Sequence, residues 1–271
     1  MMDIDFLFQL LNESGVSGNE LSVLNLCRER VADKSEISYD RIGNLFAKIN
    51  SKESDTATRI LIEAHIDEIG FQVTYIDNEG YVYIRPCGGI DGATLIGSFV
   101  DIQCRNESLT GVVGRKPVHL MKGDEKIKMP DCDAVWIDTG FDAEAVKAKV
   151  RVGDYVSFKP NAIILGKNRI TSKAIDNRVG AFILTQIIDK LPTISDKQIT
   201  LAFTTQEELG CKGGAVAACG ETYDYIICID AAFSSDVPDI SPRVVGDIRL
   251  GEGAVVYRNG DVDRNFVEQI L

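Results

Sequence analysis

Long apolar runs are missing from this 271-residue sequence, and no stretch approaches the roughly 18 residues that a membrane-spanning helix needs. The first residues carry Asp3 and Asp5 and no basic residue, which argues against a secretory signal peptide. Basic residues are fewer than acidic ones: the sequence has 29 Lys and Arg and 41 Asp and Glu, which gives a formal net charge of −12. A nucleic-acid groove and an anionic membrane surface both require clustered positive charge. We therefore expect no nucleic-acid partner and no membrane partner.

Paired cysteines are missing as well. The seven cysteines are scattered, odd in number and never spaced as Cys-x-x-Cys, so the sequence predicts neither a disulfide framework nor a thiolate zinc site. We expect these cysteines to be reduced and mostly buried, in a cytoplasmic protein. The hydrophobic share of 45% and the charged share of 26% are those of an ordinary globular chain, which excludes a disordered or fibrous protein.

Two kinds of hydrophobic pattern alternate along the chain. Residues 1–67 and 165–271 combine helical periodicity with compact apolar runs, as in an α/β domain. From about Gly70 to Lys159 the apolar segments are short, alternating and separated by turns, which indicates a small all-β barrel or sandwich. The predicted fold is a mixed-sheet α/β domain made of residues 1–67 and 165–271, interrupted by a barrel-like all-β domain at residues 68–164.

The α/β part has recognisable individual elements. Apolar periodicity predicts helices around residues 6–11, 21–28, 179–191 and 213–219. Compact apolar runs predict buried strands at residues 60–64, 198–204 and 225–229.

Acidic and imidazole side chains follow the ends of these predicted strands or begin a predicted helix. In open α/β sheets, sites form outside the carboxyl ends of the strands, so we expect these side chains to converge. Oxygen donors with one imidazole suit Zn²⁺, Co²⁺ or Mn²⁺. The candidate residues are His65 and Asp67 after the first strand, Asp176 at a helix start, Glu207 and Glu208 after the second strand, and Asp230 after the third.

Each candidate taken alone has a structural explanation. A single histidine at a strand end is commonly a hydrogen-bonded structural residue, and Asp176 could simply cap its helix. Adjacent glutamates usually form a solvated pair. Glu207 and Glu208, however, follow a strand that should be buried and precede a Gly-rich turn. Like charges are costly there unless a cation is present, so the combined pattern favours a metal site.

Three segments carry a family resemblance. They are Ala64-His65-Ile66-Asp67-Glu68-Ile69-Gly70, Lys173-Ala174-Ile175-Asp176-Asn177-Arg178-Val179-Gly180 and Thr205-Gln206-Glu207-Glu208-Leu209-Gly210. In this order they resemble the dinuclear metalloaminopeptidases, a family that includes the tetrahedral (TET) aminopeptidases and the bacterial glutamyl aminopeptidases. Some members of that family have carried the name endoglucanase. The similarity extends from the first predicted helix to about Gly253.

The resemblance implies a zinc-peptidase-like catalytic domain with an inserted dimerisation domain, assembled into homo-oligomers from dimers to dodecamers. It implies two divalent metal ions, zinc or cobalt and possibly manganese, and short peptides as substrates that lose their N-terminal residues. By the family pattern, His65 and Asp230 bind one metal ion, Asp176 bridges both, and Glu208 binds the second. Glu207 is the general base. From its position two residues after His65, Asp67 is the second candidate catalytic residue, as a partner that fixes the tautomer of the imidazole, although a surface aspartate is the commoner role.

One family feature has no counterpart here. The family pattern ends with a late histidine that completes the second metal site, whereas this chain has two histidines and His119 lies in the inserted segment. We therefore expect weak binding of the second metal, and a truncated or degenerate member with weak or no peptidase activity. Two other functions stay open: an inactive scaffold subunit of the same fold, and a glycoside hydrolase that uses two carboxylates without metal.

Overall fold

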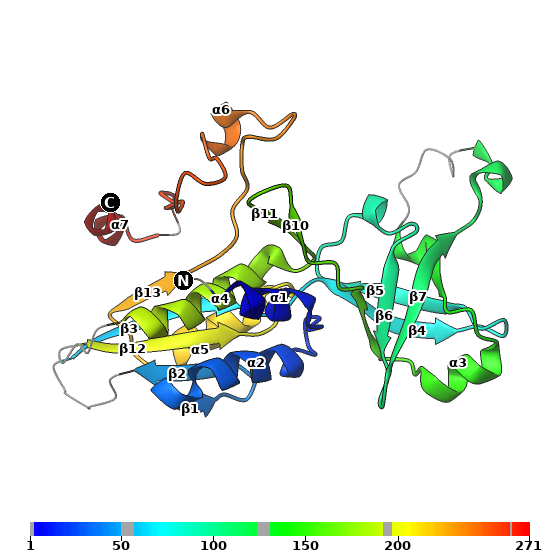
Figure 1. Cartoon of the computed structure of the whole chain (residues 1–271), viewed down its shortest axis with the longest axis horizontal. Helices are drawn as coiled ribbons and strands as arrows, with labels where there is room; N and C mark the ends of the chain where they lie inside the picture. The colour runs from blue at the N-terminus through cyan, green and yellow to red at the C-terminus, as the bar shows by residue number, and fades with distance from the viewer. Residues whose placement is uncertain (1–2, 50–56, 124–130, 192–196, 261) are drawn as a thin grey trace. The chain divides into compact units, whose positions relative to one another are not determined.

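The computed structural model describes residues 3–49, 57–123, 131–191, 197–260 and 262–271, and it confirms an α/β fold with a mixed sheet (Figure 1). The strand order in the five-stranded sheet is β1 (Glu36–Tyr39), β2 (Leu45–Ile49), β12 (Lys197–Thr204), β3 (Thr58–His65) and β13 (Tyr225–Cys228). The first three of these strands pair antiparallel, whereas β12, β3 and β13 run parallel. The carboxyl ends of these three parallel strands therefore lie at one edge of the sheet.

Helices cover both faces of this sheet (Figure 1). The larger core lies between one face and the helices α1 (Ile4–Asn12), α2 (Leu21–Val31) and α4 (Ile175–Lys190). On the other face, α5 (Lys212–Gly220) packs through Ala217 against Leu61 and Ala202. The predicted helices and strands of the α/β part are thus present, with ends displaced by a few residues.

The segment between β3 and β10 contains a closed barrel. Its strands, in barrel order, are β4 (Gly70–Ile76), β5 (Val82–Cys87), β8 (Val135–Asp138), β7 (Ser108–Arg115), β6 (Phe99–Gln103) and β9 (Tyr155–Phe158). The helix α3 (Ala143–Lys149) packs against β4 and contributes Val146 to the separate hydrophobic core of the barrel. The first barrel strand pairs with the last, because Phe71 lies opposite Val156. Residues 124–130 of the predicted insertion lie outside the described residues.

The chain divides into two compact units, Met1–Asp230 and Ala231–Leu271. The first contains the sheet, the barrel and a hairpin of β10 (Ile163–Leu165) and β11 (Arg169–Thr171). The second contains the short helices α6 (Pro242–Val245) and α7 (Arg264–Ile270). Across the described ranges, no helix combines the length and the apolar character that crossing a bilayer requires.

Two details differ from the sequence predictions. The strand at residues 225–229 is not buried: β13 exposes Tyr225 and Ile226, because it pairs with β3 on one side and no described strand pairs with its other side. The cysteines are free, as expected, but they are not mostly buried. Cys211, Cys219 and Cys228 are exposed, since they lie at or near α5 and on β13 rather than in the cores.

Candidate functional site

Three of the sequence-predicted ligands meet at the carboxyl edge of the parallel strands. His65 is the last residue of β3, and Asp230 follows β13, the neighbouring strand. Asp176 lies in the first turn of α4, where its backbone is extended rather than helical. One donor atom from each of the three side chains lies within 4.8 Å of the others. The strand-end rule accounts for the approach of His65 and Asp230, which lie after neighbouring parallel strands although 165 positions separate them.

The imidazole of His65 is the centre of this cluster. Its Nε2 lies 3.0 Å from Asp176 Oδ1 and 3.7 Å from Asp230 Oδ1, and 3.9 Å from Glu207 Oε2. The ring is buried, whereas Asp176 and Asp230 are exposed. Burial by itself lowers the pKa of His65, but its interactions with Asp176, Asp230 and Asp67 outweigh burial and raise the pKa to about 12. The carboxylates therefore stabilise a positive charge at the centre of the cluster.

Asp67 lies behind the imidazole and does not reach the surface. Its Oδ1 is 3.3 Å from His65 Nδ1, and the side chain is fully buried. The same carboxylate accepts the backbone N–H of Glu207 at 3.0 Å and that of Glu208 at 3.1 Å. Burial raises the pKa of Asp67, but His65 and the Glu207 N–H outweigh it and hold the pKa below its usual value. This one carboxylate thus orients the ring of the histidine and the loop that carries both glutamates.

Glu208 lies at the border of the cluster rather than inside the three-residue group. Its pKa is raised to about 7, first by burial and then by the negative charge of Asp176. A Cβ placed on Gly88, which has φ +89°, would lie 3.3 Å from Glu208 Oε2 and 2.7 Å from the side chain of Ile69. Glycine at residue 88, directly after β5, therefore leaves room for the Glu208 carboxylate.

Asn177 connects the Asp176 turn to the strand before Asp230. Its side-chain amide donates to the Ile229 carbonyl oxygen at 2.7 Å, and its Oδ1 accepts the N–H of Gly180 at 3.0 Å. The residue is fully buried. Sequence reasoning missed this role, although its adjacency to Asp176 in the Asp-Asn-Arg segment was a visible signal.

A buried ionic network lies beneath the site, and sequence reasoning assigned it no role. Lys173 Nζ contacts both oxygens of Glu68, at 2.7 and 2.8 Å, and Glu68 also accepts the N–H of Gly15. Arg178, fully buried, donates to the carbonyl oxygens of Ile66 and Leu10. Lys173 and Arg178 flank Asp176 in sequence, and Glu68 follows Asp67. The network therefore joins the two segments that carry the cluster.

The donor set fits a divalent cation. Ligand atoms bound at about 2.0–2.2 Å to one tetrahedral metal ion lie about 3.4 Å apart, and the Nε2–Oδ1 distances of 3.0 and 3.7 Å bracket that value. One imidazole with carboxylates is a donor set of zinc, cobalt and manganese sites.

The sequence and the fold both place the chain in a known class. Residues 43–270 match the M42 glutamyl aminopeptidase family, and the chain belongs to this family. A putative aminopeptidase, SgcX, of Escherichia coli is 32% identical over 252 residues, which are 91% of this chain and 66% of that protein. This chain therefore spans about two thirds of the length of that relative.

Solved structures give the same classification. An aminopeptidase from the archaeon Desulfurococcus kamchatkensis superimposes with a TM-score of 0.84 at 33% identity, covering 92% of this chain and 68% of that one. The TET1 peptidase of Pyrococcus horikoshii, described as assembling into a tetrahedron or an octahedral shell, has a TM-score of 0.77 at 30% identity. That match covers 88% of this chain and 72% of the other. The predicted family resemblance is thus confirmed.

Proposed function

We propose that this protein is a metal-dependent aminopeptidase that removes N-terminal residues from short peptides. The observation that carries the proposal is the convergence of His65, Asp176 and Asp230, with Glu207 3.9 Å from the imidazole. Membership of an aminopeptidase family supports the reaction class. Neither an inactive scaffold nor a metal-independent glycosidase would need an imidazole among these carboxylates.

The proposed metal ligands combine the family pattern with the grouping of His65, Asp176 and Asp230. His65, Asp176 and Asp230 would hold one cation, and Asp176 with Glu208 would hold a second. Bound zinc, cobalt or manganese would polarise the scissile carbonyl and lower the pKa of a water molecule. Three donors would bind the first cation more tightly than two carboxylates would bind the second, so we expect one cation to survive dialysis.

The remaining roles belong to the protein's own side chains. Glu207 is the general base, which takes a proton from the attacking water and passes it to the leaving amine. Its Oε1 accepts a hydrogen bond from Cys211 Sγ at 3.1 Å, and its Oε2 is the oxygen nearer to His65. Asp67 is buried and touches the imidazole and the loop backbone, so we assign it the role of a positioning residue.

Removing the metal tests the proposal directly. We expect protein treated with a chelator to lose hydrolysis of aminoacyl-peptide substrates, and zinc, cobalt or manganese to restore it. Elemental analysis after dialysis is expected to find one cation per chain, which His65→Ala removes. His119→Ala is the matched control, because this second histidine is exposed in the barrel segment and should leave metal content and activity unchanged.

The same assay separates the alternatives. Metal binding with no peptidase activity under any added cation would indicate a scaffold subunit. Cleavage of a β-glucan that resists the chelator would indicate a glycosidase. Either result would overturn the aminopeptidase proposal.

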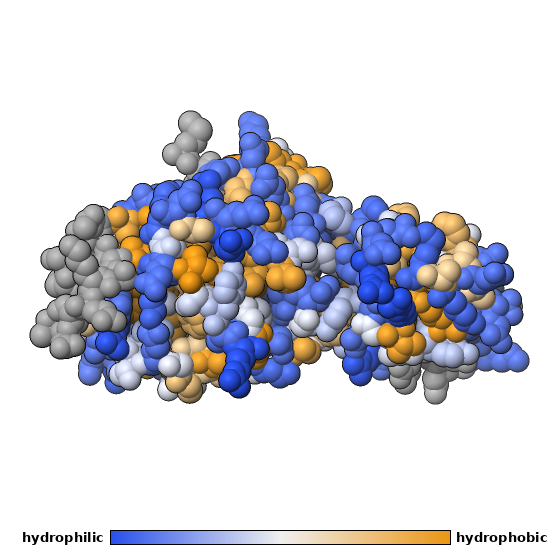
Figure 2. Space-filling model, turned by 90° about the horizontal axis from the view of Figure 1, so that it is seen from below, coloured by the Kyte–Doolittle hydropathy of each residue, from blue (hydrophilic) through white to orange (hydrophobic). Residues whose placement is uncertain are grey.

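We also propose a homo-oligomer that assembles through the barrel, in a compartment that keeps the seven cysteines reduced, such as the cytoplasm. The TET1 neighbour assembles, and in this chain Val118 and Leu120 expose 50% and 63% of their area on the barrel segment. Met121, by contrast, is buried, and Trp136 stacks edge-on with Tyr81. Apolar and hydrophilic residues intermix on the face that Figure 2 displays, so exposure alone does not locate the interface.

Light scattering at micromolar concentration tests the assembly. We expect a mass that is a multiple of 29.7 kDa, and we expect Val118→Lys with Leu120→Lys to reduce it, because two charges in an apolar contact oppose association. Leu250→Lys, at an exposed position of the second unit, is the control and should not change the mass. A monomer at these concentrations would contradict the proposal.

A further inference from the structure

The backbone N–H groups at the start of the loop after β12 donate to side chains from other parts of the chain. The N–H of Thr205 donates to Asn44 Oδ1 at 2.9 Å, and those of Glu207 and Glu208 donate to Asp67. The N–H between them, that of Gln206, donates to Glu20 Oε1 at 3.2 Å. Every backbone donor of this four-residue segment therefore has a distant acceptor, and Glu20 supplies one of them.

Gln206 requires such support because its backbone is left-handed, with φ +55°. Residues other than glycine rarely adopt this conformation, since Cβ crowds the following carbonyl group. The two residues that follow are Glu207 and Glu208. A change at Gln206 would therefore redirect both carboxylates at once.

The side chain of Glu20 is a buried carboxylate, and burying a charged group costs free energy. It is 8% exposed, and it begins α2 without using its side chain to cap the helix. Its Oε1 instead accepts the N–H of Gly18 at 2.6 Å and that of Gln206. Burial raises the pKa of Glu20 and the charge of Asp67 adds to this, which outweighs the hydrogen bonds that its carboxylate accepts from Gly18 and Gln206.

We propose that Glu20 is a positioning residue for Glu207 and Glu208. By accepting the N–H of Gln206, it holds the left-handed turn in which the next two N–H groups meet Asp67 and the two carboxylates face the His65 cluster. The catalytic consequence rests on the proposed function, whereas the effect on the loop does not.

The geometry suggests variants of Glu20 that should keep the conformation of the loop and others that should lose it. Both donors meet the same oxygen of Glu20, so the amide oxygen of Glu20→Gln can accept both and should retain the loop. Glu20→Ala removes the acceptor, and Glu20→Asp is one methylene too short to reach. Gln206→Gly removes the steric cost of the left-handed backbone, so it should rescue Glu20→Ala.

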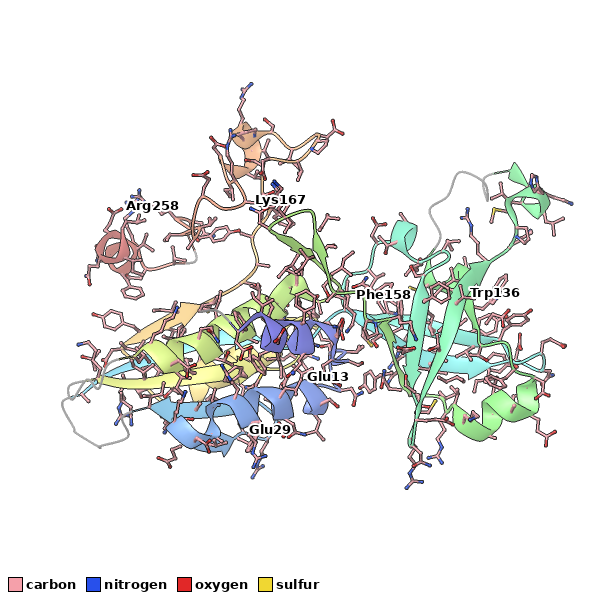
Figure 3. All side chains as sticks on the ribbon, viewed as in Figure 1. Glu13, Glu29, Trp136, Phe158, Lys167 and Arg258 are labelled. Carbon is pink, nitrogen blue, oxygen red and sulfur yellow. The ribbon has the colours of Figure 1, made fainter. Side chains whose placement is uncertain are left out.

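Two measurements report the result. Amide hydrogen exchange over residues 205–211 is expected to be at least about tenfold faster in Glu20→Ala than in the wild type, and slower again in Glu20→Ala/Gln206→Gly. Peptidase kcat is expected to fall about 10- to 100-fold in Glu20→Ala with little change in KM, because displaced catalytic groups act on the reaction step. Glu29→Ala, on the exposed side of α2 (Figure 3), is the control for loss of a carboxylate from that helix.

The outcomes are distinguishable. Wild-type exchange in Glu20→Ala, or equal loss of protection in Glu20→Gln and Glu20→Ala, would overturn the inference. If Glu20→Ala does not fold, the pair Glu20→Gln and Glu20→Asp decides, and equal exchange in these two would also overturn it. A wild-type protein without peptidase activity would contradict the proposed function, and the exchange data alone would then decide the role of Glu20.

Discussion

Replacing Glu207 with glutamine is expected to lower kcat for peptide hydrolysis by about 10²- to 10⁴-fold, the range that general acid–base groups contribute. Glutamine keeps the size of the side chain and can keep the contact with Cys211, but it cannot take up a proton. The backbone N–H of residue 207 still donates to Asp67, so the loop should stay in place. The metal content should not change, because Glu207 is not one of the three clustered donors.

The measurement combines initial rates on an aminoacyl-peptide with elemental analysis of the same preparation. Glu29→Gln is the matched control, because this substitution makes the same chemical change at an exposed residue of α2, away from the site. A Glu207→Gln protein that retains more than a tenth of the wild-type kcat would exclude Glu207 as the base. Loss of metal together with activity would instead assign Glu207 as a ligand.

The second large effect concerns stability. Lys173→Met is expected to reduce the free energy of unfolding by about 3–5 kcal/mol, because the buried Glu68 carboxylate loses the ammonium group that contacts both of its oxygens and keeps only the longer contact with Arg178 Nη2 at 3.5 Å. Both side chains are nearly inaccessible, so water cannot replace the lost ammonium group. The variant also loses the contact of Lys173 Nζ with the Glu13 carbonyl oxygen. Urea unfolding followed by circular dichroism measures the change.

Two further variants show whether the charge is responsible. Lys173→Met with Glu68→Gln should recover part of the loss, since the charges of Lys173 and Glu68 are then removed together and the amide can still accept the N–H of Gly15. The recovery is incomplete because Arg178 stays charged and loses its contact with the Glu68 carboxylate. Lys34→Met removes a lysine that pairs with Asp189 at the surface, and it should cost about 1 kcal/mol or less. Equal losses in Lys173→Met and Lys34→Met would contradict this account of the network.

The central part of the site could be predicted because it depends on topology. Apolar runs that end in His65 and before Glu207 and Asp230 indicate strands, and parallel strands bring their carboxyl ends together. The assigned roles of these residues stay predictions until the variants are measured, as do the domain boundaries at residues 67/68 and 164/165. The α/β fold with its mixed sheet could be predicted for the same reason, since its elements have clear periodicity.

The supporting residues could not be predicted, because their contacts leave no periodic signal. Glu20 and Lys173 have the composition of ordinary surface charges, and only the folded chain shows that one accepts from a loop 186 residues away and the other pairs with Glu68. The left-handed backbone of Gln206 has no sequence marker, since that conformation is normally marked by glycine or asparagine. The exposure of Cys228 depends on which strand lies at the sheet edge, and composition does not encode this.

The pairing of the first and last barrel strands has a consequence for the order of folding. β3 and β12 must pair across more than 130 intervening residues, and the entropy of closing a loop grows with its length. When Phe71 and Val156 lie opposite one another, the barrel has already brought the two ends of its segment together. The remaining connection is then about a third as long, which lowers the entropic cost of sheet closure by about 1 kcal/mol. A barrel that folds first would thus act as a clamp that accelerates formation of the sheet and, with it, of the edge where His65 and the carboxylates meet.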